Sequence, residues 1–168
     1  IKPDCAVAIS TASAQTLARY SFPVVFASVT DPIGANLVSN LDKPGKNITG
    51  VMDYLKAQPQ IELILKVLPQ LKTLGIIYNP SEVNSVKMVH SIKTYCQEIG
   101  ITTFEAVVNS TIDVSAAALS LLGKVDAIFV PSDNTVVSAI ATLADIGVKR
   151  SLPIFAADIG SVIGGALA

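Results

Sequence analysis

The sequence predicts an α/β fold with parallel sheets, and two features of its pattern lead to this prediction. Short, nearly continuous apolar runs rich in β-branched residues alternate along the chain with segments of helical period. Continuous apolar runs are typical of strands covered on both faces, as parallel strands are. Strands that alternate with helices imply right-handed βαβ units, in which the strands of one sheet run parallel.

The apolar runs give the predicted strands. In chain order they are Cys5–Ile9, Val24–Val29, Leu74–Tyr78, Thr102–Val108, Ala127–Val130 and Pro153–Ala156. Each is short and mostly apolar, as buried strands are. Cys5 begins the first run and is therefore expected to be buried.

Apolar stripes at helical spacing predict four helices between the later strands. Their members are Ile61, Ile64, Leu65 and Leu68; Val86, Val89, Ile92, Cys96 and Ile99; Val114, Ala118, Leu121 and Leu122; and Val136, Ile140, Leu143 and Ala144. Gly100, Gly123 and Gly147 follow the last three stripes and are predicted to be C-caps, because glycine tolerates the left-handed backbone found there. Cys96 lies on a stripe and is expected in the core. His90 lies off that stripe, which favours a surface position.

Residues 32–54 break the alternation of strands and helices. Asp31-Pro32, Lys43-Pro44-Gly45 and Gly50 are turn and loop signals. A change of this kind suits a boundary between lobes, which we place near Val51. The predicted lobes are residues 1–51 and 52–168.

Composition narrows the classes of partner. The net charge is −1 and no run of Lys or Arg occurs, so neither nucleic acid nor an anionic membrane surface is expected as the main partner. The longest uncharged stretch, residues 5–18, is shorter than the roughly 20 apolar residues that a membrane-spanning helix needs. The two cysteines and one histidine have no metal-binding spacing, so no metal or other cofactor is expected.

Polar residues follow the predicted strands at their carboxyl ends, where ligands bind in doubly wound sheets. The candidate ligand-binding residues are Ser10, Thr11, Thr30, Asp31, Asn84, Ser85, Asp133, Asn134 and Asp158. No Lys, Arg, His or Cys accompanies them, so no catalytic nucleophile with an adjacent base is predicted. Hydroxyls and helix N-terminal amides suit a carboxylate, whereas a carboxylate side chain suits an ammonium group. These residue types predict a zwitterionic, amino-acid-like ligand rather than a reaction.

Each candidate also has a purely structural explanation. Ser, Thr, Asn and Asp are preferred N-caps, so a capping role alone would account for Thr11, Asn84, Asn134 and Asp133. Asp31 precedes Pro32 and suits the start of a turn. Ligand contact is favoured at Asp158, because a short apolar strand delivers it to the expected cleft.

Six motifs spread along the chain are distinctive as a set. They are Ala8–Gln15, Pro23–Pro32, Lys43–Val51, Tyr78–Ser85, Val130–Thr135 and Phe155–Asp158, the last followed by Gly165-Ala166-Leu167-Ala168. Together they resemble the tryptophan-type ABC transporter substrate-binding proteins over essentially the whole chain. The resemblance implies the type I periplasmic-binding-protein fold, in which two α/β lobes joined by crossover strands close on a ligand. The chain then begins at the third strand of the first lobe, so the N-terminal lobe is expected to be incomplete.

The resemblance also implies roles for the candidate residues. Ser10, Thr11 and Thr30 would receive the ligand carboxylate, and Asp158 the ammonium group. The opposite wall of the cleft would be lined by Asn84, Ser85, Asp133 and Asn134. The expected protein is an exported solute-binding component of an ABC importer, periplasmic or otherwise extracytoplasmic and often lipid-anchored in this family. Its expected partners are an amino-acid-like ligand and the transporter's membrane subunits.

Two other functions share this two-lobed build. An amino-acid racemase uses one cysteine from each lobe, but Cys5 begins a strand and Cys96 lies within a helix, away from the strand ends. The effector domain of a transcriptional repressor would need a basic helix-turn-helix upstream of this chain. The motifs favour transport over both.

Overall fold

The computed structural model describes residues 3–167 and divides into two compact units, Ile1–Leu55 and Lys56–Ala168. The division lies four residues beyond the boundary expected at Val51, since the end of a strand occupies that position. The two units are described separately below.

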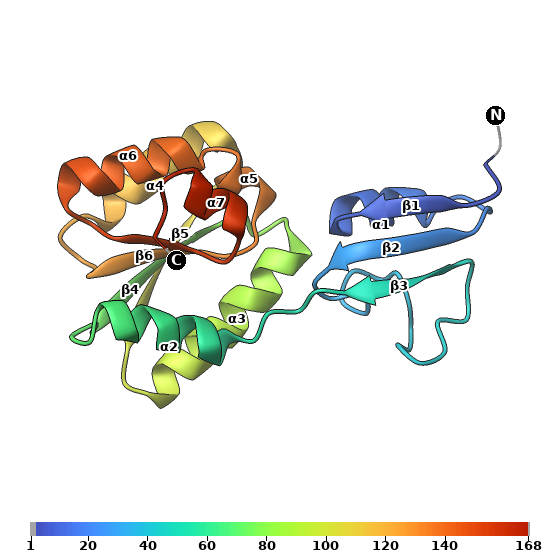
Figure 1. Cartoon of the computed structure of the whole chain (residues 1–168), viewed down its shortest axis with the longest axis horizontal. Coiled ribbons are helices and arrows are strands. Elements are labelled where there is room, and N and C mark those ends of the chain that lie inside the picture. The colour runs from blue at the N-terminus through green and yellow to red at the C-terminus, as the bar shows by residue number, and fades with distance from the viewer. Residues whose placement is uncertain (1–2, 168) are drawn as a thin grey trace. The chain divides into compact units, whose positions relative to one another are not determined.

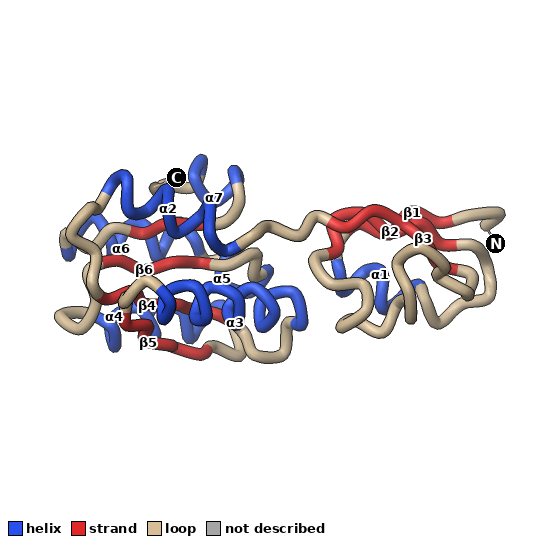
Figure 2. The backbone as a smooth tube through the Cα atoms, turned by 90° about the horizontal axis from the view of Figure 1, so that it is seen from below, coloured by secondary structure: helices blue, strands red, loops and turns tan. Residues whose placement is uncertain are grey.

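Unit 1 is built on a three-stranded parallel sheet of order β1-β2-β3. Its elements are β1 (Ala6–Ile9), α1 (Thr11–Leu17), β2 (Val24–Val29) and β3 (Ile48–Met52). Ala8, Phe26 and Ile48 point to one face, where they form a core with α1 and with loop residues such as Leu37. Figure 2 shows α1 and the loops on a single side of the three strands.

Two expectations for unit 1 are wrong. Residues 48–52 form β3, although the glycine and the preceding turn signals indicated a loop. The strand exists because Gly50 pairs with Phe26 in a space without room for a side chain: a Cβ on Gly50 would lie 2.0 Å from the Phe26 carbonyl oxygen. Cys5 is exposed, because β1 begins one residue later at Ala6.

Unit 2 contains a four-stranded parallel sheet of order β5-β4-β6-β7. Its strands are β4 (Thr73–Tyr78), β5 (Thr102–Val107), β6 (Ala127–Val130) and β7 (Ile154–Ala156). The helices are α2 (Ala57–Val67), α3 (Val83–Glu98), α4 (Val114–Leu121), α5 (Asn134–Val137), α6 (Ile140–Arg150) and α7 (Ile159–Ile163), with a short 3-10 turn, η1 (Thr111–Asp113). The predicted α/β class with parallel sheets is confirmed in both units.

Helices cover both faces of the unit 2 sheet (Figure 1). Alternate residues of each strand point to opposite sides. Phe129 of β6 packs with α2 and α3, whereas its neighbours Ile128 and Val130 pack with α4 and α6. Cys96 lies in the first of these cores, as expected, and burial raises the pKa of its thiol to about 11.

The predicted helices of unit 2 are present, with one correction. Gly100 and Gly123 adopt positive φ just beyond α3 and α4, as C-caps do. Gly147 instead lies inside α6, and the left-handed residue at the end of that helix is Ser151. Gly147 is there for close packing, since a Cβ would lie 2.6 Å from Ile154 Cγ1. The fourth stripe is split between α5 and α6.

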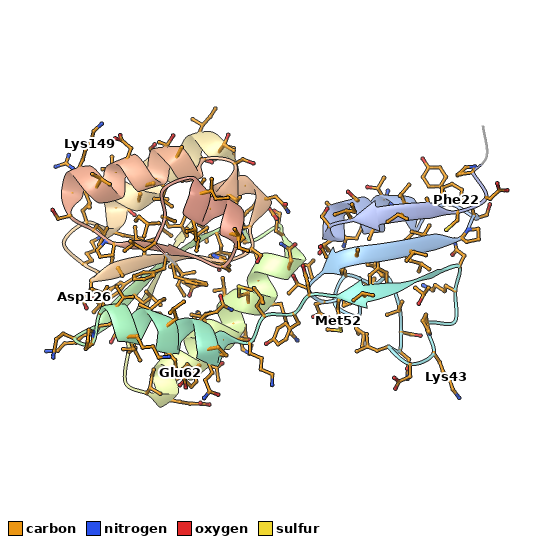
Figure 3. All side chains as sticks on the ribbon, in the orientation of Figure 1. Phe22, Lys43, Met52, Glu62, Asp126 and Lys149 are labelled. Atoms are coloured by element: carbon orange, nitrogen blue, oxygen red, sulfur yellow. The ribbon has the colours of Figure 1, made fainter. Side chains whose placement is uncertain are left out.

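Two surface features complete the fold. His90 is exposed on α3, as its position off the apolar stripe predicted. Lys149 projects from the outer side of α6 (Figure 3), where it pairs with Asp145 one turn earlier. Among residues 3–167, no helix is long and apolar enough to cross a membrane.

Candidate functional site

The carboxyl ends of β4 and β6, which are neighbours in the unit 2 sheet, carry a connected set of polar residues. We call Asn79, Glu82, Asn84, Asp133, Asn134 and Thr135 the strand-end network. Asn79 follows β4 directly; its backbone N–H donates to Asp133 Oδ2 at 2.7 Å. Its side-chain amide donates to Thr135 Oγ1 at 2.9 Å. The loops after the two strands are therefore joined although they are more than fifty residues apart.

Asp133 is the buried centre of this network. Asp133 is fully buried. Its other carboxylate oxygen, Oδ1, accepts from the Val136 backbone N–H at 2.9 Å, and this bond caps the N-terminus of α5. Burial raises the pKa of this carboxyl group, and the hydrogen bonds from Asn79 and Val136 offset part of that effect. The hydroxyl of Ser85 is also fully buried and lies close enough to this carboxyl group to lower its pKa in part. Asp133 thus has the capping role that the sequence allowed, together with a tie to β4.

Glu82 supplies the most extensively bonded carboxylate of the network. It precedes α3 and makes no capping bond to the backbone of that helix, although its Oε2 accepts weakly from the Asn84 side-chain amide at 3.4 Å. Its Oε2 accepts from the backbone and side-chain nitrogens of Asn134 at 2.9 and 2.7 Å. Its Oε1 accepts from the backbone nitrogen and hydroxyl of Thr135 at 3.0 and 2.9 Å. Although burial raises the pKa of Glu82, these four bonds outweigh it, and the pKa lies below its usual value.

Asn84 and Asn134 are not N-caps, which corrects one of the two explanations given for them. The residues in those positions are Glu82 and Asp133. Asn84 lies within α3, buried, and its amide donates to the Ser132 carbonyl at 2.6 Å. Asn134 is exposed at the start of α5. A ligand contact by either residue remains a prediction.

Asp158 lies at the carboxyl end of β7, where the sequence placed it. It caps α7: Oδ1 accepts from the Ser161 backbone N–H at 2.8 Å and Oδ2 from the Ser161 hydroxyl at 2.6 Å. The residue is half-buried, and no basic side chain pairs with it among the residues that the structure describes. Its carboxylate is thus held in place by one partner residue.

The predicted residues of unit 1 lie at the carboxyl ends of β1 and β2. Thr11 and Thr30 are each 6% exposed. Ser10, rather than Thr11, is the N-terminal cap residue of α1, and it has a φ of 84°, in the region that favours glycine. Asp31 accepts from the Gly34 backbone N–H at 2.9 Å, which confirms its role in a turn.

Cavities within single units lie away from these residues. One of about 250 Å³ in unit 1 is lined by apolar residues that include Phe26, Val38 and Met52. One of about 310 Å³ in unit 2 is lined by Val148, Ile154 and their neighbours. In the described part of the chain, no group of three or more His, Cys, Asp or Glu side chains could hold a metal ion.

Sequence reasoning did not select Asn79, Glu82 or Thr135, which carry much of the strand-end network. All three do lie in the quoted motifs Tyr78–Ser85 and Val130–Thr135. Glu82 bonds to Asn134 and Thr135, which lie more than fifty positions later in the chain, and no local sequence pattern indicates a contact over that separation.

The comparisons with known proteins agree with this fold. Residues 1–168 match the family described as ABC transporter substrate binding protein. The chain belongs to this family of substrate-binding proteins. The resemblance stated from the motifs, and the prediction of a binding protein rather than an enzyme, are confirmed by this match.

Individual relatives carry more specific descriptions. The tyrosine-binding protein of Clostridioides difficile is 40% identical over 169 residues, covering 99% of this chain and 49% of the relative. A crystal structure of an ABC domain from Streptococcus pneumoniae in complex with L-Trp has a TM-score of 0.93 and 42% identity, covering 98% of this chain and 56% of that one. A conserved domain protein from Vibrio cholerae has a TM-score of 0.94 and 39% identity, covering 99% and 57%. The chain thus spans about half the length of the relatives it matches.

Proposed function

We propose that this protein is the solute-binding component of an ABC importer and binds an amino acid with an aromatic side chain, L-tyrosine or L-tryptophan, in a cleft between its two lobes. The observation that carries the proposal is the similarity to the Streptococcus protein in complex with L-Trp, which extends over both units at 42% identity. The similarity to the tyrosine-binding protein points to the same class of ligand.

The residue types at the strand ends support a zwitterionic ligand. Hydroxyl groups of Ser10, Thr11 and Thr30 are suited to the ligand carboxylate, since neutral donors bind an anion without a competing charge. Asp158 is suited to the ammonium group, because it is a carboxylate without a basic partner among the described side chains. The proposed complex therefore places opposite ends of the ligand against different units.

Membership of the family supports an extracytoplasmic location and a role with membrane-embedded transporter subunits. Export of the protein, with or without a lipid anchor, is part of the proposal. Cell fractionation tests it directly, and recovery of the protein in the cytoplasm would contradict it.

Calorimetric titration of the protein with the twenty common amino acids tests the ligand. We expect binding of L-tyrosine or L-tryptophan, and a rise in the melting temperature at saturating ligand, because a ligand that binds only the folded state stabilises it. Absence of binding by every amino acid would overturn the proposal.

Asp158→Asn tests the contact to the ammonium group. The variant keeps the shape and the capping capacity of the side chain but removes its charge. If the ammonium then stays buried without a counter-charge, the loss is about 2–5 kcal/mol, which is about 30- to 5,000-fold in affinity.

Ser161→Ala is the matched control, because it removes the hydrogen bond that the Ser161 hydroxyl donates to Asp158 and leaves the charge of Asp158 in place. It should change affinity far less than Asp158→Asn does. A loss below about threefold in Asp158→Asn would mean that Asp158 is only a cap.

A further inference from the structure

The strand-end network fixes the orientation of one exposed side chain, that of Asn134. A carboxylate accepts hydrogen bonds and donates none. The amide of Asn134 must therefore turn its NH₂ group toward Glu82, where Nδ2 lies 2.7 Å from Oε2. Its carbonyl oxygen, Oδ1, then faces away from Glu82, and no residue between 3 and 167 donates a hydrogen bond to it.

The orientation is doubly secured. The same carboxylate oxygen holds the Asn134 backbone N–H at 2.9 Å, so the start of the side chain is fixed as well as its end. The other oxygen holds Thr135 through both its backbone and its hydroxyl. Glu82 itself is held by its place immediately before α3.

We propose that Glu82 is a positioning residue that makes Asn134 present a hydrogen-bond acceptor to the ammonium group of the ligand. This inference rests on the proposed function, because it assigns a role within the same binding site. An outward carbonyl oxygen complements an ammonium donor, and an outward NH₂ group would repel it. Glu82 thus selects ligands with a free amino group without contacting them.

Glu82→Gln tests the proposal, because a glutamine offers both an acceptor and a donor. It therefore cannot accept from both Asn134 and Thr135 as Glu82 does. With its NH₂ group toward Asn134 it loses the Asn134 backbone N–H, and it pairs with the Asn134 side chain only if that amide reverses and turns its own NH₂ group outward. We expect the affinity for L-tyrosine and L-tryptophan to fall at least about tenfold. The affinity for 3-(4-hydroxyphenyl)propionate, which lacks the ammonium group, should change by less than about twofold. These thresholds exceed the usual error of a calorimetric titration and correspond to about 1.4 and 0.4 kcal/mol.

Asp126→Asn is the matched control at the opposite end of the same strands. Asp126 accepts from the backbone nitrogens of Lys72 and Thr73 at 2.8 and 2.7 Å and from the Thr73 hydroxyl at 2.9 Å, so it also ties β4 to β6. Its variant should lower the melting temperature as Glu82→Gln does and leave the affinity for both amino acids unchanged.

A second variant keeps the test sharp if Glu82→Gln folds poorly. Asn134→Ala removes the acceptor and leaves Glu82 bonded to Thr135, so it should show the same loss for the amino acids and the same indifference to the propionate. In the double variant the two losses should not add.

Equal losses for amino acid and propionate, equal losses in Asp126→Asn, or unchanged binding in Glu82→Gln would each overturn the proposal. If the unmodified protein binds neither amino acid, the proposed function itself fails. Normal binding by the unmodified protein, with no effect of Glu82→Gln, contradicts only the role of Glu82.

Discussion

The sheets of the two units differ in how many of their faces are buried. Both are parallel sheets of apolar strands, but the unit 2 sheet has a core on each face, whereas the unit 1 sheet has one core on one face. Val7, Ile9, Val25 and Val51 form what we call the open face of unit 1, and they are exposed by 67, 67, 39 and 71%. The apolar strand pattern is nevertheless the same in both units.

This difference shows what a strand pattern encodes. A nearly continuous apolar strand indicates that both faces are suited to burial. It does not specify which segment provides the cover. In unit 2, the helices between the strands cover both faces. In unit 1, nothing among residues 3–55 covers the open face enough to bury it.

Truncation in the core of unit 2 should have the largest effect on stability. Phe155 is fully buried on β7, so Phe155→Ala should lower the free energy of unfolding by about 3–5 kcal/mol through lost burial and the cavity it leaves. Val51→Ala on the open face should cost less than about 0.5 kcal/mol. Urea denaturation followed by circular dichroism measures both. A cost above about 1 kcal/mol for Val51→Ala would mean that the open face is covered in solution.

The two cysteines provide a chemical version of the same comparison. Cys5 of unit 1 is exposed, whereas Cys96 of unit 2 is buried with a thiol pKa of about 11. Only about one in a thousand Cys96 thiols is ionised at pH 8, and only the thiolate reacts. Alkylation of the folded protein at pH 8 should therefore modify Cys5 alone, and urea should release Cys96. Rapid modification of both thiols without urea would show that unit 2 opens readily.

The rates of amide hydrogen exchange should also differ between the two units, with a smaller effect than that of the preceding variants. β1 has an unpaired edge among the described residues and one covered face, whereas β6 is paired on both sides and covered on both faces. Amides of residues 6–9 should exchange at least about ten times faster than those of residues 127–130, a difference of about 1.4 kcal/mol in local opening. Equal protection would contradict the one-sided description of unit 1.

Lowering the pH should destabilise unit 2 by protonating Glu82 and Asp126, and this is the smallest of the four effects predicted in this comparison. Hydrogen bonds hold the pKa of Glu82 and of Asp126 below their usual values. Each carboxylate therefore contributes stability above its unfolded pKa, and loses it as pH falls through the folded pKa. The urea midpoint should decrease as pH is lowered from 5 to 3. The Glu82→Gln/Asp126→Asn double variant should show a smaller decrease, and an identical pH dependence would contradict this account.

Much of the fold could be predicted because its signals are local. The strands β2 and β6 have the limits that their apolar runs indicated. β3 has no such local signal, since its stability comes from Phe26, which lies beside Gly50 only in the folded sheet. The pattern predicts a cap at Gly147, because the close contact of this glycine with Ile154 of β7 leaves no signal in the neighbouring sequence.

The candidate site follows the same rule. Asp133 and Asp158 could be placed at strand ends because each lies two or three residues beyond an apolar strand. Glu82 could not, since a glutamate before a helix has the pattern of an ordinary first-turn residue. Its partners are set by the pairing of β4 with β6, which sequence spacing alone does not reveal.

The strand order of unit 2 also determines how long β4 stays unpaired on one edge while the chain is being synthesised. β4 is made before the other strands of its sheet but lies inside it, between β5 and β6. Its partner β5 follows after one helix, whereas the residues that bond to Glu82 come 52 and 53 positions later. At about 5–20 residues per second, a nascent chain waits several seconds with one edge of β4 unpaired. During that interval a hydrophobic strand is available to chaperones or to neighbouring chains, and the arrival of β6 brings the exposure to an end.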